Sequence, residues 1–205
     1  AGRIHLIDRN GKDVGGFPID LPAKATAPLA VFDYEGTKDY RAVVGLADGR
    51  IVNYGMDGAA TTGWETPRLN GPSTNATQHL RIKNKDYLVA FDRNGPIKVL
   101  DRRGSEREKA TLELGEGARV LALTPGLEWS TSQVIWADTT GTLHSAALNG
   151  TAKALSGPGT NQLGEMADDG LHDIVQVKSD SVLVSHSGKE VWSRSFGTSL
   201  HPAVD

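Results

Sequence analysis

The sequence has no cysteine, few aromatic residues and no long hydrophobic run. Without cysteine, the chain forms no disulfide and offers no thiolate ligand to a metal ion. None of its apolar runs approaches the roughly 18–20 residues that a membrane-spanning helix needs. We therefore expect no transmembrane segment.

The chain also lacks a strong excess of one charge. Its 22 Lys and Arg residues face 25 Asp and Glu, and the formal net charge is −3. The overall charge thus gives no reason to expect nucleic acid or an anionic membrane as a partner. The chain begins at Ala1 without an initiator methionine or a signal-like apolar segment, so we expect it to be a segment of a longer product.

Turn residues, by contrast, are plentiful and evenly spread, with 24 Gly and 9 Pro. The clearest stretch runs from Leu80 to Leu114 and predicts four short strands joined by three tight turns. The turns are expected at 84–86, 92–95 and 101–104, with the glycine that ends each of the last two at positive φ. One such meander cannot bury both of its faces, so neighbouring copies must cover them.

Weaker copies of this meander fill the rest of the chain. The glycine of the third turn recurs at positions 11, 58, 104, 150 and 188, in steps of 47, 46, 46 and 38 residues. A period in the forties with four strands per unit is typical of a β-propeller, in which adjacent blades shield each other's faces. We predict an all-β propeller, or an arc of one, that forms a single domain over residues 1–205 with about five four-stranded antiparallel blades. The expected units are 1–24, 25–71, 72–115, 116–158, 159–197 and, as the start of a further unit, 198–205; first strands are expected near 27–33, 76–83, 118–124, 161–166 and 200–204.

Three fourth strands carry a large aromatic residue close behind the turn glycine. These residues are Phe17, Trp64 and Trp192. A ring of this size fills the gap between two stacked sheets, so each is expected to wedge between adjacent blades.

The last copy resembles a known repeat. Residues 185–192, Ser-His-Ser-Gly-Lys-Glu-Val-Trp, follow the apolar segment 182–184. They look like the repeat of quinoprotein-like (PQQ-like) propellers, whose units end in a Gly-Lys-x-x-Trp type turn, and segments 7–14 and 54–58 are similar but looser. The resemblance implies a propeller fold and often a cell-envelope location, and the family includes both alcohol dehydrogenases and non-enzymatic assembly scaffolds.

A second segment resembles FG-GAP and VCBS repeats, whose first loop carries a calcium motif. Residues 167–175 match the end of that motif, and 33–39 are a shortened variant. The resemblance implies a Ca²⁺ site at Asp168, Asp169 and Asp173. Ca²⁺ takes six to eight oxygen ligands and neither loop holds the full set, so solvated turn acids are the alternative.

Positive charge is concentrated locally, because residues 81–109 hold nine Lys and Arg against five Asp and Glu. Arg102, Arg103 and Arg107 are predicted to belong to a binding patch for an acidic partner; the alternative is a blade edge whose charges deter sheet pairing. Trp129 lies in the long insertion 124–132, where it is either an exposed contact residue or packed onto its own blade.

No catalytic set is recognisable. The sequence shows no Gly-x-Ser-x-Gly elbow, phosphate loop or dinucleotide fingerprint, and its acidic clusters sit in turns. His5 and His144 occupy the same repeat position and are given a structural role. We name no catalytic or cofactor-binding residue, and Ca²⁺ is the single cofactor considered.

These observations favour a non-catalytic protein-interaction or scaffold module of an envelope, periplasmic or secreted protein. A protein partner is expected and nucleic acid is not. The alternative is part of a quinoprotein-like or carbohydrate-active propeller enzyme whose catalytic residues lie partly outside this chain.

Overall fold

The computed structural model is all-β, and its strands form five antiparallel sheets. The structure describes residues 2–73, 75–164, 172–186, 189–197 and 199–200. Three sheets have four strands, one has three and one has two. Among the described residues, no helix has the length and apolar character needed to cross a membrane.

Each sheet is a meander whose strands pair in chain order. The first sheet is β1 (Arg3–Ile4) and β2 (Ile19–Asp20), and the second is β3 (Ala30–Phe32), β4 (Arg41–Gly45) and β5 (Ile51–Gly55). The third is β6 (Gln78–Ile82), β7 (Lys85–Ala90), β8 (Lys98–Leu100) and β9 (Glu106–Lys109). The fourth is β10 (Arg119–Thr124), β11 (Gln133–Ala137), β12 (Leu143–Ala147) and β13 (Lys153–Ala154). The fifth is β14 (Thr160–Gly164), β15 (Asp173–Val177), β16 (Ser181–His186) and β17 (Lys189–Ser195).

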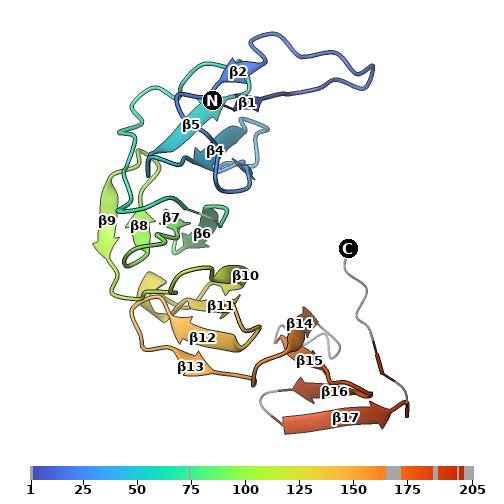
Figure 1. Cartoon of the computed structure of the whole chain (residues 1–205). Helices are drawn as coiled ribbons and strands as arrows, with labels where there is room; N and C mark the ends of the chain where they lie inside the picture. Colours follow the sequence, from blue (N-terminus) through green and yellow to red (C-terminus); the bar gives the residue numbers. More distant parts are fainter. Residues whose placement is uncertain (1, 74, 165–171, 187–188, 198, 201–205) are drawn as a thin grey trace.

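The sheets follow one another along an open arc and do not close into a ring (Figure 1). In the third and fourth sheets the first strand lies on the inner side of the arc and the last strand on the outer side (Figure 1). This is the arrangement of propeller blades. The first strands β3, β6, β10 and β14 lie where the repeat predicts them.

Four hydrophobic clusters lie between the sheets, one at each junction. The central strand β7 shows how one strand supplies two of them. Tyr87 and Val89 belong to the cluster shared with the fourth sheet, whereas Leu88 and Ala90 belong to the cluster shared with the second. Successive side chains of a strand point to opposite faces, so a strand that is apolar throughout is buried on both sides. The predicted mutual covering of blades is confirmed.

The predicted turns of the third sheet are right in place but not in every detail. Gly104 has φ +81° as expected. Gly95 does not have positive φ; in its turn, Asp92 accepts the backbone N–H of Asn94 at 3.0 Å and also bonds to the preceding link. The first turn lies one residue earlier than predicted, with Lys83 and Asn84 at φ 48° and 62°.

The aromatic wedges are confirmed at two of three positions. Phe17 packs on the cluster shared by the first and second sheets. Trp64 packs on the cluster between the second and third sheets, and a Cβ on Gly104 of the third sheet would lie 3.2 Å from its ring. Trp192 on β17 is 46% exposed, so the prediction that it wedges between blades is wrong for the described chain.

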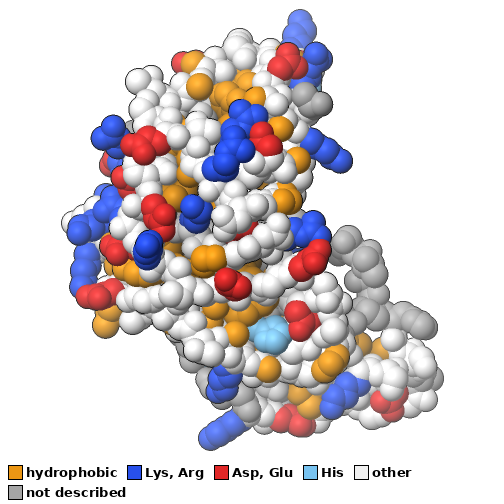
Figure 2. Space-filling model, turned by 60° about the vertical axis from the view of Figure 1, so that its left-hand side comes forward, with side chains coloured by type: hydrophobic (Ala, Val, Ile, Leu, Met, Phe, Trp, Pro, Cys, Tyr) orange, Lys and Arg blue, Asp and Glu red, His pale blue; other side chains and the backbone are white. Residues whose placement is uncertain are grey.

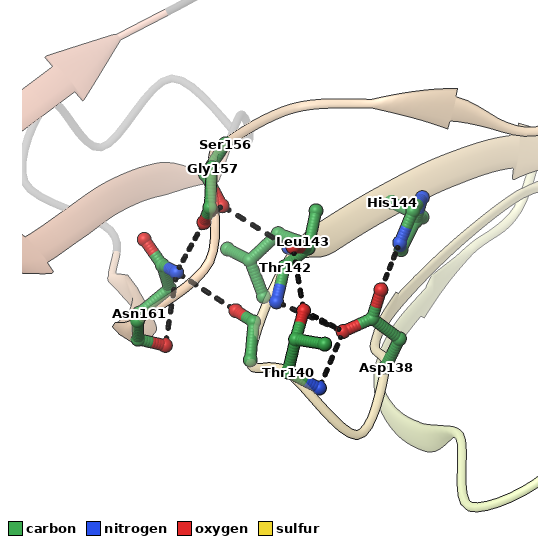
Figure 3. Close-up of polar contacts among 10 residues, drawn as sticks. Asp138, Thr140, Thr142, Leu143, His144, Ser156, Gly157 and Asn161 are labelled. Carbon is green, nitrogen blue, oxygen red and sulfur yellow. Dashed lines mark hydrogen bonds and ion pairs between the residues drawn. The ribbon is translucent and has the colours of Figure 1, made fainter.

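Side-chain hydrogen bonds join successive sheets beside these apolar clusters. The buried Asp92 accepts backbone N–H groups of Asn70 and Gly71 from the preceding link, at 2.6 and 3.1 Å. At the junction of the fourth and fifth sheets, Asn161 donates its side-chain amide to the carbonyl of Gly141 at 2.8 Å (Figure 3). Buried polar groups of this kind need partners, so they set how one sheet sits against the next.

Candidate functional site

The strongest concentration of functional groups lies at one end of the second and third sheets. In a meander, the loops that join the first strand to the second and the third to the fourth emerge at the same end. The β3–β4 loop (33–40), the β6–β7 turn and the β8–β9 turn therefore meet there. They enclose a cavity of about 410 Å³, which we call the basic groove.

Five cations and three acids line the basic groove. The cations are Arg81, Lys85, Arg102, Arg103 and Arg107, and the acids are Glu35, Asp86 and Asp101. Arg81 and Arg102 pair with acids of the groove. Within the described part of the chain, Lys85, Arg103 and Arg107 form no ion pair. The groove thus keeps positive charge that its own residues do not neutralise.

Asp86 is the buried centre of the groove, with a side chain only 5% exposed. One oxygen accepts from His79 Nε2 at 2.7 Å, and the other lies 2.5 Å from a guanidinium nitrogen of Arg102. Arg81 lies farther away, at 3.9 Å, and donates to the carbonyl of Tyr34 at 2.5 Å. A buried carboxylate must be paired, so Asp86 holds both cationic side chains in place.

Arg102 crosses the junction between the two sheets. It pairs with Glu35 of the second sheet and with Asp86 of the third, and its guanidinium lies 4.8 Å from the centre of the Tyr34 ring. Burial acts to lower the pKa of Arg102, but the hydrogen bonds and charges of Glu35 and Asp86 outweigh this and raise the pKa. Arg102 therefore stays charged at all relevant pH values.

The Tyr34 ring lies against Arg102, next to the groove. Its ring lies 5.2 Å from His79 in an edge arrangement and 5.9 Å from Phe32. Burial raises the pKa of Tyr34 to about 12, so its hydroxyl keeps its proton.

The positive charge of the groove is local. On the face shown in Figure 2, Lys and Arg side chains lie among Asp and Glu and do not form one continuous basic surface. The unpaired cations of the groove thus form a local patch of positive charge.

The structure brings three of the four predicted interaction residues together. Arg102, Arg103 and Arg107 all line the basic groove. Trp129 does not, because it begins a short 3₁₀ helix (Trp129–Thr131), is half-buried and packs on the cluster between the third and fourth sheets. Of the two alternatives for Trp129 the packed one holds, and Leu127, 84% exposed, is the most exposed apolar residue of that loop.

The proposed calcium ligands fall mostly outside the described residues. Asp168 and Asp169 lie outside the residues that the structure describes. Asp173 is described; it is 1% exposed on β15 and accepts from His186 Nδ1 at 2.8 Å. In the similar loop 33–39, Asp33 accepts the backbone N–H groups of Thr37 and Lys38. The Ca²⁺ site remains a prediction, which calorimetric titration of the chain with Ca²⁺ would test.

Histidine–aspartate pairs recur in several sheets without meeting. His5 bonds to Asp13 at 3.0 Å, and His144 bonds to Asp138 at 2.8 Å within the fourth sheet (Figure 3). Hydrogen bonds from His144 and Thr140 hold the pKa of Asp138 well below its usual range. Among the described residues, no three His, Asp or Glu side chains gather as metal ligands would.

Sequence reasoning missed Glu35 and Asp86 as parts of the groove, and it missed Tyr34 and His79, which contact groove residues. The signal that could have found them is the repeat itself. Its phase places the 33–40 loop, the 83–86 turn and the 101–104 turn at one end of adjacent blades, so their polar residues converge.

The comparisons with known proteins show the fold. No family model matches the sequence, and no curated protein does. Two solved structures of BBS1N in complex with ARL6DN, one soaked with lead and one with mercury, match with TM-scores of 0.59 and 0.60 and identities of 17% and 16%. They cover 96% and 94% of this chain, which spans 63% and 61% of theirs. BBS1N contains a β-propeller, and the chain is similar to it in fold: an arc of propeller-like blades.

Proposed function

We propose that the chain is a non-catalytic protein-interaction module that binds a short acidic segment of a partner in the basic groove. The observation that carries the proposal is the convergence of Lys85, Arg103 and Arg107 on one cavity without an ion-pair partner among the described residues. Arginine donates in a planar fork that matches a carboxylate, and Arg102 is already held in place by Asp86 and Glu35. The fold neighbour BBS1N was solved bound to another protein, ARL6DN, which supports an interaction role for this kind of blade stack.

The experiment is a binding titration with labelled eight-residue peptides rich in Glu, Gln or Lys, followed by fluorescence anisotropy. We expect the Glu-rich peptide alone to bind and its affinity to fall as salt rises, because exposed charges are screened. The double variant Arg103→Glu/Arg107→Glu should weaken binding at least about tenfold, since two attractive contacts become repulsive.

The matched control is Arg9→Glu/Lys12→Glu, which makes the same change in net charge in an exposed turn of the first sheet. It should leave binding within about twofold. Equal losses in both double variants would mean that net charge alone matters, and tighter binding of a single-stranded oligonucleotide than of the peptide would also overturn the proposal.

The proposal keeps the envelope or secreted context that the quinoprotein-like resemblance implies. Fractionation of the producing cells, with the chain followed by an antibody, tests that location. Recovery in the cytoplasm alone would contradict it.

A further inference from the structure

A second, smaller cavity lies beside the basic groove on the side of the second sheet. It has a volume of about 240 Å³ and shares Glu35 and Arg102 with the groove. Its remaining walls come from the β3–β4 loop and the start of β4, and from Asn53 on β5 and Thr61 just after it. We call it the side pocket.

The side pocket gathers buried hydrogen-bond donors that have no partner. They are the Tyr34 hydroxyl, the Asn53 amide nitrogen and the Arg102 Nε, three of the five such buried atoms among the described residues. Asn53 is 2% exposed, and its amide oxygen accepts from the Thr61 hydroxyl at 2.9 Å, which leaves the nitrogen as the unused end. Buried donors without partners are costly, and a cluster of them in one cavity points to an acceptor from outside the chain.

The charges of the side pocket cancel. Arg41 is held by both oxygens of Asp39, at 2.5 and 2.7 Å, and Arg102 is paired with Glu35. Two guanidinium groups therefore face two carboxylates in its walls. A pocket without net charge has no electrostatic reason to take a free anion or a cation, so its occupant is neutral.

The Tyr34 ring is not available for stacking. It lies against His79 and Phe32, and the guanidinium of Arg102 covers it. A sugar or a nucleobase, which uses an open aromatic face, therefore finds no platform in the side pocket. An amide needs no such face: its carbonyl oxygen accepts two hydrogen bonds and its N–H donates one.

We propose that the side pocket binds a neutral amide group of the peptide that occupies the basic groove. The amide oxygen accepts from the Tyr34 hydroxyl and the Asn53 amide nitrogen beside the Arg102 Nε, and its N–H faces the carboxylates of Glu35 and Asp39. This inference rests on the proposed function for the identity of its partner, and it adds a specificity: an acidic residue in the groove, followed by an amide in the side pocket.

Nuclear magnetic resonance tests this directly, because the ¹H–¹⁵N spectrum of the labelled chain shows the Asn53 side-chain amide and the Arg102 Nε–H. Acetamide is the probe for a side-chain amide, blocked triglycine for a backbone amide, and sodium acetate and glucose are the comparison ligands. We expect saturable shifts of both signals with one of the amide probes, at about 10–100 mM for a ligand this small. No shift with either amide probe, meaning that water alone satisfies the donors, or larger shifts with acetate or glucose, would overturn the proposal.

The variant Tyr34→Phe removes one donor and nothing else. It should weaken the binding of the amide probe about fivefold, the ratio expected for one hydrogen bond, without lowering the Tm. Tyr54→Phe is the matched control, since Tyr54 lies on the same sheet but not in the side pocket, and it should leave the affinity unchanged. Unchanged affinity in Tyr34→Phe would contradict the assignment.

The charge-reversal pair separates this inference from the proposed function. Arg103→Glu/Arg107→Glu should abolish binding of the Glu-rich peptide but leave the acetamide shifts intact, because neither residue lines the side pocket. If the native chain shows the acetamide shifts but does not bind the Glu-rich peptide, the acidic partner alone is rejected. If it binds the peptide but shows no acetamide shifts, the side pocket alone is rejected.

Discussion

Asp86 shows how one buried charge can organise a surface site. Its oxygens meet His79 and Arg102, and Arg102 in turn contacts Glu35 and the Tyr34 ring of the neighbouring sheet. A single carboxylate thus fixes the positions of the groups that a ligand would meet. The groove is therefore preorganised by the buried Asp86 and its contacts rather than by its exposed residues.

Asp86→Asn should destabilise the chain by about 2 kcal/mol. Removing one partner of a buried pair leaves the other uncompensated, although the loss is reduced because Arg102 is itself a third exposed. Urea unfolding followed by circular dichroism measures this. Asp20→Asn is the control, since the Arg3–Asp20 pair is largely exposed and should contribute nearly nothing; an equal effect of the two substitutions would contradict the role of Asp86.

Asp138 predicts a dependence of stability on pH. Bonds from His144, Thr140 and the backbone lower its pKa from 3.8 in the folded chain. Its contribution is therefore fully present above about pH 4 and is lost as the pH falls through the lowered value. The difference in unfolding free energy between the native chain and Asp138→Asn should shrink as the pH falls below 4. A difference that grows on acidification would show that the sign is wrong.

At the level of single elements, Gly104 in the β8–β9 turn lies close to the preceding sheet. It has φ +81°, and a Cβ there would lie 2.8 Å from Pro67 Cδ and 3.2 Å from the Trp64 ring. Gly11 has φ +79° in the equivalent turn of the first sheet, with nothing within 4 Å. The two glycines share the same left-handed backbone conformation, but only Gly104 has a neighbouring sheet close by.

Gly11→Ala should therefore cost about 1 kcal/mol from the left-handed backbone alone. Gly104→Ala should cost about 2–4 kcal/mol, because the neighbouring sheet must also move. Thermal unfolding of the two variants gives the difference. If both lose the same stability, the close approach of Trp64 to this turn has no energetic consequence.

The elements that the sequence predicts best are those with a repeated pattern. First strands, blade order and the covering of both faces follow from the spacing of turn glycines and from apolar runs such as Leu88–Ala90. The conformation of Gly95 could not be predicted, because Asp92 of its turn also bonds to Asn70 and Gly71, far away in the sequence. The 83–84 turn could not be placed to the residue, because Lys83 adopts positive φ without any mark in the sequence.

The site is only half visible in the sequence. Clustered Arg102, Arg103 and Arg107 mark one wall, because they lie in one turn and the strand after it. The other wall comes from Glu35, more than sixty residues away in the chain, and charge clustering alone does not reveal it. The sequence could not place Trp129, because an aromatic residue in a loop can pack on a hydrophobic cluster and still stay partly exposed, as it does here.

At the scale of the whole molecule, the sheets form a linear series in which each one contacts its neighbours. Counted over the described residues, the cluster between the third and fourth sheets is the largest, and the one between the fourth and fifth is the smallest. Stability in such a series is the sum of the single blades and the junctions between them.

Hydrogen exchange should follow this gradient. Amides of β7, whose side chains enter two clusters, should exchange slowest, and those of β17, whose residues are all exposed, should exchange fastest. Mass spectrometry of exchanged peptides reads both strands in one experiment. Uniform protection from β1 to β17 would mean that the chain unfolds as one unit.

The walls of the basic groove belong to two different sheets, with Glu35 on one side and the cations of β6, β7 and the β8–β9 turn on the other. A ligand that contacts both walls would link the second and third sheets and make the arc stiffer at their junction. Linkage works in both directions, so any force that bends the arc there must also change how tightly the ligand is held. If pulling on the ends of the chain bends the arc at this junction, the affinity of the groove for a peptide would depend on the applied force.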